Sequence, residues 1–160
     1  MRAGKHFALF IVGYEELGPS VHVGVVRPIQ MDMNDVGDTF SPLYIGAYNP
    51  RDQRTARWGT SEIHCCSFWL GSGRCWSTEW PRPYHEPDIY EWEGRITWNN
   101  SPKEKVGLLL DLDQGTLTAY DGSIKLGVIK EGLGGEYSWF THIEEEKCSV
   151  SMERHPLPST

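Results

Sequence analysis

Short apolar runs separated by turn residues dominate this chain. Runs such as Phe7–Val12, Val21–Val26 and Val106–Leu112 are bounded by Gly, Pro, Asn and Asp. Runs of this kind predict strands, whereas no segment shows a sustained helical period with capping residues. Further strands are expected at 43–49, 61–70, 75–78, 116–120, 124–129, 136–143 and 148–152, with 89–98 as an edge strand or a packed loop.

The clearest part of this pattern is Val106–Ile129, which reads as three strands and two turns. Asp113-Gln114-Gly115 supplies the first turn, and Asp121-Gly122 is a strong hairpin signal. Such a meander cannot bury its own apolar side chains, so it needs a second sheet. About ten short strands in all predict an all-β, antiparallel two-sheet β-sandwich.

Length and charge narrow the picture further. The 160 residues suit a single domain, with a core over about 5–152 and a tail at 153–160. No run of about 18 apolar residues is present, so we expect no membrane span. The N-terminus lacks the apolar segment of a signal peptide, which favours an intracellular, cytoplasmic protein. The net charge of −7, without a basic run, argues against a nucleic-acid partner.

The metal-binding residue types do not form a recognised site. Cys65, Cys66, Cys75 and Cys148 match no common zinc spacing, and adjacent cysteines in a strand point to opposite faces. Reduced, buried thiols are therefore expected, with a Cys75 disulfide only in an oxidising compartment. The acidic stretch 32–43 starts like an EF-hand loop but lacks the later oxygen ligands. We expect no metal and no cofactor.

Several segments resemble one known family. Leu110–Tyr120, Lys125–Ile129 and Gly132–Trp139 are similar to the C-terminal signature of SPRY domains, while Val23–Pro28 and Trp58-Gly59 resemble two earlier family segments. The resemblance implies a jelly-roll, concanavalin A-like sandwich. It also implies a protein-interaction module rather than an enzyme. Because SPRY domains usually have strands before the first one seen here, it further suggests either a piece of a larger multidomain protein or a trimmed fold.

In SPRY domains, loops at one end of the sandwich bind the partner, which is a protein or a short linear peptide. By position, the segments 44–58 and 144–147 correspond to such loops, and Trp58 is expected to support them from below. The resemblance therefore implies that the contact residues are Tyr44, Tyr48, Arg51, Arg54, Glu144 and Glu145.

Two other functions fit parts of the sequence. Exposed Trp residues on a sandwich would also suit a carbohydrate-binding module. The spacing of Glu86, Asp88 and Glu91 resembles the catalytic strand of laminarinase-like β-glucanases, in which two close carboxyl groups act on a sugar. Pro87 argues against that reading because it cannot donate a hydrogen bond in a central strand. The six His residues have no Ser or acidic neighbours at a catalytic spacing, so we expect no catalytic residue.

Overall fold

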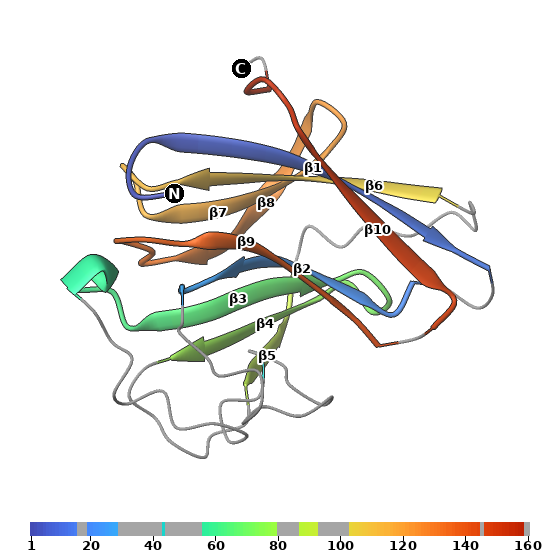
Figure 1. The fold of residues 1–160 in the computed structure, drawn as a ribbon, viewed down its shortest axis with the longest axis horizontal. Helices are drawn as coiled ribbons and strands as arrows, with labels where there is room; N and C mark the ends of the chain where they lie inside the picture. The colour runs from blue at the N-terminus through green and yellow to red at the C-terminus, as the bar shows by residue number, and fades with distance from the viewer. Residues whose placement is uncertain are drawn as a thin grey trace.

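Two five-stranded antiparallel sheets face each other in the computed structural model (Figure 1). The structure describes residues 1–15, 19–28, 43, 56–79, 87–92, 103–144 and 146–158. Within these ranges lie ten strands and one short 3-10 helix, η3. Their bounds are β1 Lys5–Tyr14, β2 Val21–Val26, η3 Ala56–Trp58, β3 Ile63–Trp69, β4 Arg74–Glu79, β5 Asp88–Glu91, β6 Lys103–Asp111, β7 Thr116–Asp121, β8 Ile124–Glu131, β9 Ser138–Ile143 and β10 Cys148–Arg154.

The strand order defines the two sheets. Sheet A has the order β10-β1-β6-β7-β8, and sheet B has the order β5-β4-β3-β2-β9. Every pairing within them is antiparallel. The predicted all-β two-sheet sandwich is therefore confirmed.

Alternate residues of each strand fill the space between the sheets. Phe10 and Val12 of β1 and Val23 and Val25 of β2 belong to this core and are fully buried. This follows from the period of two in a strand, which sends every second side chain to the same face. The same rule separates the adjacent cysteines as expected: Cys66 belongs to this core, whereas Cys65 packs on the outer face of sheet B.

Strand positions agree with the sequence pattern except at a few ends. The β7–β8 turn residues are Gly122 and Ser123, because Asp121 still pairs with Ile124; the turn lies one residue later than Asp121-Gly122. Strand β10 continues to Arg154, so the tail begins after that residue and not at 153. Of the strand expected at 43–49, the structure describes only Leu43, and of 89–98 it describes 89–92. No described helix is long and apolar enough to cross a membrane.

One end of the sandwich is closed by a buried arginine. The Arg27 side chain is fully buried beneath Trp58 of η3 and the ring of Tyr137. The Tyr137 hydroxyl donates a 2.9 Å hydrogen bond to the carbonyl oxygen of Ile63. The Gly-rich loop before β9 approaches η3 so closely that a Cβ on Gly135 would overlap the Trp58 carbonyl. Trp58 is thus buried at this end of the sandwich, and residues 44–55 of the segment that it was expected to support lie outside the described residues.

Candidate functional site

A single row of side chains crosses the outer face of sheet B, the face turned away from sheet A. From edge to edge it consists of His142, His22, Trp69, Arg74 and Glu91, each directly opposite the next in the strand register. Their five strands are β9, β2, β3, β4 and β5. The register of the sheet, rather than proximity in sequence, brings these residues together.

The next row along this face is mostly apolar. Phe140 of β9, Trp76 of β4 and Ile89 of β5 lie in it, with Gly24 and Ser67 between them. A Cβ on Gly24 would collide with the backbone of β3, so only glycine fits there. Leu43 packs on Trp76 and Cys65 and buries this part of the face. At the β5 edge of the face, Ile89, Arg74 and Glu91 are exposed, and Trp69 beside them is half-buried.

His22 is the fixed centre of the row. Its imidazole is fully buried and stacks on the Trp69 ring at 5.4 Å with an interplanar angle of 8°, and the Trp76 ring meets it edge-on at 4.9 Å. Nδ1 lies 3.3 Å from the Ser67 hydroxyl. Burial lowers the pKa of His22 to about 4, against a smaller opposing effect of Glu144. The imidazole is therefore neutral at pH 7.

Glu144 connects the β9–β10 turn to Ser20 and lies close to His22 of the row. Its Oε2 accepts a 2.7 Å hydrogen bond from the Ser20 hydroxyl, and its backbone N–H donates to the Ser20 carbonyl at 3.0 Å. Its Oε1 lies 3.5 Å from His22 Nε2. The carboxylate thus has a structural role, while its side chain stays 31% exposed and open to a partner.

Ser67, His22 and Glu144 consequently have an arrangement that resembles a Ser–His–acid triad. Sequence spacing did not reveal it, because Ser67 lies 45 residues from His22 and Glu144 lies still further away. Ser67, however, is fully buried in the middle of β3, where no substrate can reach its hydroxyl. His22 Nε2 makes no hydrogen bond to Glu144, so the three side chains form neither a continuous hydrogen-bond chain nor an activated nucleophile.

The exposed half of the row carries residue types that are typical of recognition surfaces. Arg74 Nη2 lies 3.4 Å from Glu91 Oε1, and these side chains are 49% and 80% exposed. Trp69 beside them is half-buried. Trp and Arg are enriched among the residues that dominate binding energy at protein interfaces. A loose surface ion pair also costs little to open when a partner arrives.

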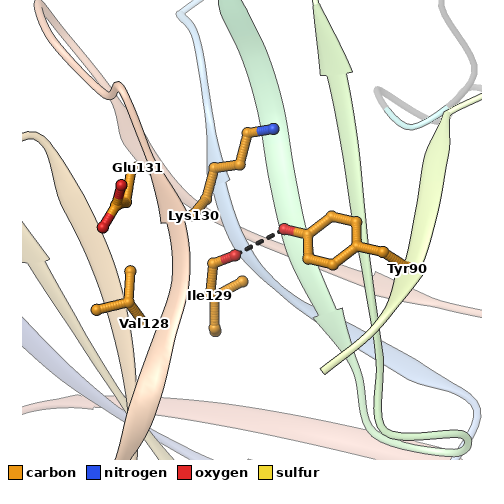
Figure 2. Close-up of a pocket in the computed structure, with 5 residues that line it drawn as sticks. All are labelled: Tyr90, Val128, Ile129, Lys130 and Glu131. Atoms are coloured by element: carbon orange, nitrogen blue, oxygen red, sulfur yellow. Dashed lines mark hydrogen bonds between the residues drawn. The ribbon is translucent and has the colours of Figure 1, made fainter. Parts of the chain in front are cut away.

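A hollow lies at the side of the sandwich where β5 and β8 approach each other. It is an open pocket of about 400 Å³, lined by Tyr90, Val128, Ile129, Lys130 and Glu131 (Figure 2). The Tyr90 hydroxyl donates a 2.7 Å hydrogen bond to the Ile129 carbonyl across it. The lining is mostly one strand, so the pocket offers few converging polar groups to a small ligand.

The carboxylates of the suggested glucanase motif do not share one face. Asp88 pairs with Ser77 on the side that faces sheet A, while Glu91 pairs with Arg74 on the outer side. Strand β5 is moreover a four-residue edge strand, and Pro87 precedes it. Glu86 lies outside the described residues. Asp88 and Glu91 therefore lie on opposite faces of β5 and cannot act on one sugar as the acid and the nucleophile of a glucanase.

The structure locates only one of the six contact residues that the resemblance implied. Glu144 lies at the β9–β10 turn, whereas Tyr44, Tyr48, Arg51, Arg54 and Glu145 lie outside the described residues. Trp58 is near Arg27 just beyond β2, at the opposite end of that strand from Glu144. Sequence reasoning missed Trp69 and Arg74 and named Glu91 only for the glucanase motif, because only the sheet register aligns the three residues.

Comparison with known proteins identifies the architecture. No family model matches the sequence, and no curated protein matches it. Among 32 matching solved chains, the crystal structure of the TRIM65 PSpry domain superposes with a TM-score of 0.51 at 15% sequence identity. The fold is SPRY-like. The match covers 97% of this chain and 66% of the TRIM65 structure, so this chain spans just under two thirds of that domain.

Proposed function

We propose that this SPRY-like sandwich is a non-catalytic interaction module that binds a peptide or a protein surface. The observation that carries the proposal is the exposed stretch of the outer row, Trp69, Arg74 and Glu91, on a rigid two-sheet frame. Rigid support lowers the entropic cost of ordering side chains on binding. The SPRY-like fold supports the same conclusion, because SPRY domains commonly recognise proteins.

Segments 44–58 and 144–147 extend this surface in the proposal. Tyr44, Tyr48, Arg51 and Arg54 would add aromatic rings and guanidinium groups, and Glu144 and Glu145 would add negative charge at the β9–β10 turn. The partner is then a protein or a short linear peptide with a carboxylate for Arg74 and an apolar group for Trp69. The four free cysteines favour a reducing, cytoplasmic compartment.

A selection from a random-peptide display library tests this proposal. Peptides selected on the wild-type protein should bind Arg74→Ala at least tenfold more weakly, because Arg74 is a central contact. The matched control is Lys125→Ala, which removes an exposed cation from β8 on the other sheet and should leave binding unchanged. Peptides that bind Arg74→Ala and a Trp69→Leu variant as tightly as the wild type would contradict the proposed surface.

A carbohydrate-binding module is the second candidate. A half-buried Trp69 beside Arg74 and Glu91 also suits a sugar, whose apolar face can stack on the indole while its hydroxyl groups bind the charged pair. A glycan array separates the two candidates. A sugar that binds, is competed by the free glycan, and is lost in Trp69→Leu would replace the peptide as the ligand class.

A further inference from the structure

The two lateral sides of the sandwich differ in whether side chains bond to the backbone of their edge strands. On the side of β5 and β8, which we call the closed side, side chains bridge the two sheets. The Tyr90 hydroxyl donates to the Ile129 carbonyl (Figure 2). Trp92 Nε1 donates a 3.0 Å hydrogen bond to the Val128 carbonyl. Lys130 Nζ also reaches the Ser77 hydroxyl of sheet B at 3.1 Å. Backbone carbonyls at the edge of β8 are thereby occupied.

The opposite side, formed by β9 and β10, is the open side. The two strands share the turn 144–147 but belong to different sheets, and they diverge from that turn (Figure 1). Strand β9 pairs only with β2 and β10 only with β1 among the strands that the structure describes. Each strand therefore presents one edge whose N–H and C=O groups have no strand partner within the described chain.

Apolar side chains line the space between these two edges. Ile143 of β9 lies opposite the buried Val21, yet it is 42% exposed. Met152 of β10 lies opposite the buried Phe10, yet it is 46% exposed. Both therefore point to the sandwich interior but remain in contact with water. Trp139 and Val150 pack on the core beside them and are only partly buried.

The charges beside the open side indicate what kind of segment would fit. Glu144 and Glu146 are exposed at the turn that joins the two strands, and Glu145 stands between them in sequence. Lys147 is the basic residue that follows them directly in the sequence, and the protein as a whole carries a net charge of −7. A Lys or Arg side chain near the turn would therefore be electrostatically favoured.

We infer that the open side binds an extended polypeptide segment as an added strand on β10. Strand β10 suits this role because its seven residues keep an unbroken register with β1, without a bulge. An added strand would satisfy the free backbone groups of β10 and direct alternate apolar side chains toward Ile143 and Met152. The segment would carry a basic residue at the end nearest Glu146. This surface meets the surface proposed above at the turn that contains Glu144 and Glu146, but the edge of β10 belongs to sheet A and not to the outer row of sheet B.

The probe is an array of synthetic eight-residue peptides. Thr alternates with Val, Ile or Phe, and one end carries Lys; each peptide has a counterpart N-methylated at alternate residues, which cannot complete a strand ladder. We expect binding that N-methylation weakens at least tenfold. Hydrogen exchange of the β10 amides should slow when peptide binds. An array without any binder, or binders indifferent to N-methylation, would overturn the inference.

Substitutions of exposed residues on the open side test whether the peptide binds there. Met152→Glu and Ile143→Glu should each weaken peptide binding at least tenfold, because they place a carboxylate in the apolar space. Ile124→Glu is the matched control, since Ile124 is 66% exposed at the start of β8 and should not affect binding. Arg74→Ala should also leave it unchanged, which separates this surface from the proposed row. Equal losses in Ile124→Glu would refute the assignment.

Sedimentation velocity tests whether a second copy of the chain, and not a foreign segment, donates the strand. A concentration-dependent dimer that Met152→Glu abolishes, together with no binder in the array, would replace the foreign segment by self-association. A monomer that binds array peptides supports the inference.

Discussion

The guanidinium carbon of Arg27 lies 4.0 Å from the centre of the Tyr137 ring, and neither side chain is exposed to solvent. Three hydrogen bonds to backbone carbonyls fix the guanidinium: Nε to Ile63 at 3.0 Å, Nη1 to Glu136 at 3.2 Å and Nη2 to Ser61 at 3.2 Å. One cation thus joins the end of β2 to the start of β3 and to the segment before β9. The planar, five-donor geometry of arginine is what permits this.

Arg27→Lys should lower the free energy of unfolding by about 3 kcal/mol, because an ammonium cannot serve three carbonyls in this geometry and leaves buried acceptors unpaired. Chemical denaturation at pH 7 measures the change. Arg74→Lys is the matched control: its half-exposed ion pair with Glu91 should contribute less than about 1 kcal/mol. Similar decreases in the free energy of unfolding of the two variants would show that the buried hydrogen bonds of Arg27 do not stabilise the fold more than a surface ion pair does.

Gly135→Ala should destabilise the protein by about 3 kcal/mol or more. Gly135 has φ +80°, and the added Cβ would overlap the carbonyl of Trp58, so strain and a steric clash act together. Gly122→Ala provides the comparison, since Gly122 has φ +58° but no atom near the added Cβ; it should cost about 1 kcal/mol. Thermal unfolding of both variants tests whether contact with η3, rather than φ alone, sets the cost.

Two buried histidines should make stability depend on pH. Burial lowers the pKa of both His22 and His64 to about 4, and Arg27 adds to the effect at His64. In the unfolded chain the imidazole pKa is 6.5, so the unfolded state binds more protons between pH 6.5 and 4. Above pH 6.5 the two histidines do not lower the free energy of unfolding. As the pH falls from 6.5 toward 4, each histidine lowers it by up to about 1.4 kcal/mol per pH unit.

Urea unfolding at intervals from pH 7.5 to 4.5 tests this dependence. His22→Gln removes one of the two titrating groups, so its stability should fall less steeply with decreasing pH than that of the wild type. An unchanged slope would mean that His22 is protonated in the folded protein, in contact with Glu144.

The cysteines should differ in reactivity toward a thiol reagent. Cys65, Cys66 and Cys75 are fully buried, and burial raises the pKa of Cys66 and Cys75 to about 12. Cys148 is only partly buried at the start of β10. Because the thiolate is the reactive form, native protein should be labelled at Cys148 alone and at all four positions after denaturation. Mass spectrometry of Cys148→Ser, which should remain unlabelled in the native state, checks the assignment.

The features that sequence reasoning predicted are the ones encoded locally. Alternation and turn residues predicted the three strands β6 to β8; β7 and β8 start at the predicted residues, whereas β6 starts at Lys103 and not at Val106. The adjacent Cys65 and Cys66 were assigned correctly to opposite faces. The turn Gly122–Ser123 was missed by one residue, because the register with Ile124 keeps Asp121 in the strand.

The outer row could not be predicted in this way. His142, Trp69 and Arg74 meet only because β9, β2, β3 and β4 pair in a particular order and register, which no local pattern specifies. The contact between Ser20 and Glu144, 124 residues apart, has the same origin. Closure of the lateral side by Tyr90 and Trp92 likewise depends on two edge strands that belong to different sheets.

The place of β1 in sheet A governs when the protein can fold. Its neighbours are β6 and β10, with Lys5 opposite Asp111 and Ala8 opposite Arg154. During synthesis at roughly 5–20 residues per second, the first strand waits for several seconds before either neighbour emerges from the ribosome. Such distant pairings also imply slow refolding, on the order of milliseconds to seconds. A nascent chain would therefore expose Phe7–Val12 throughout this interval and would benefit from a chaperone that covers it.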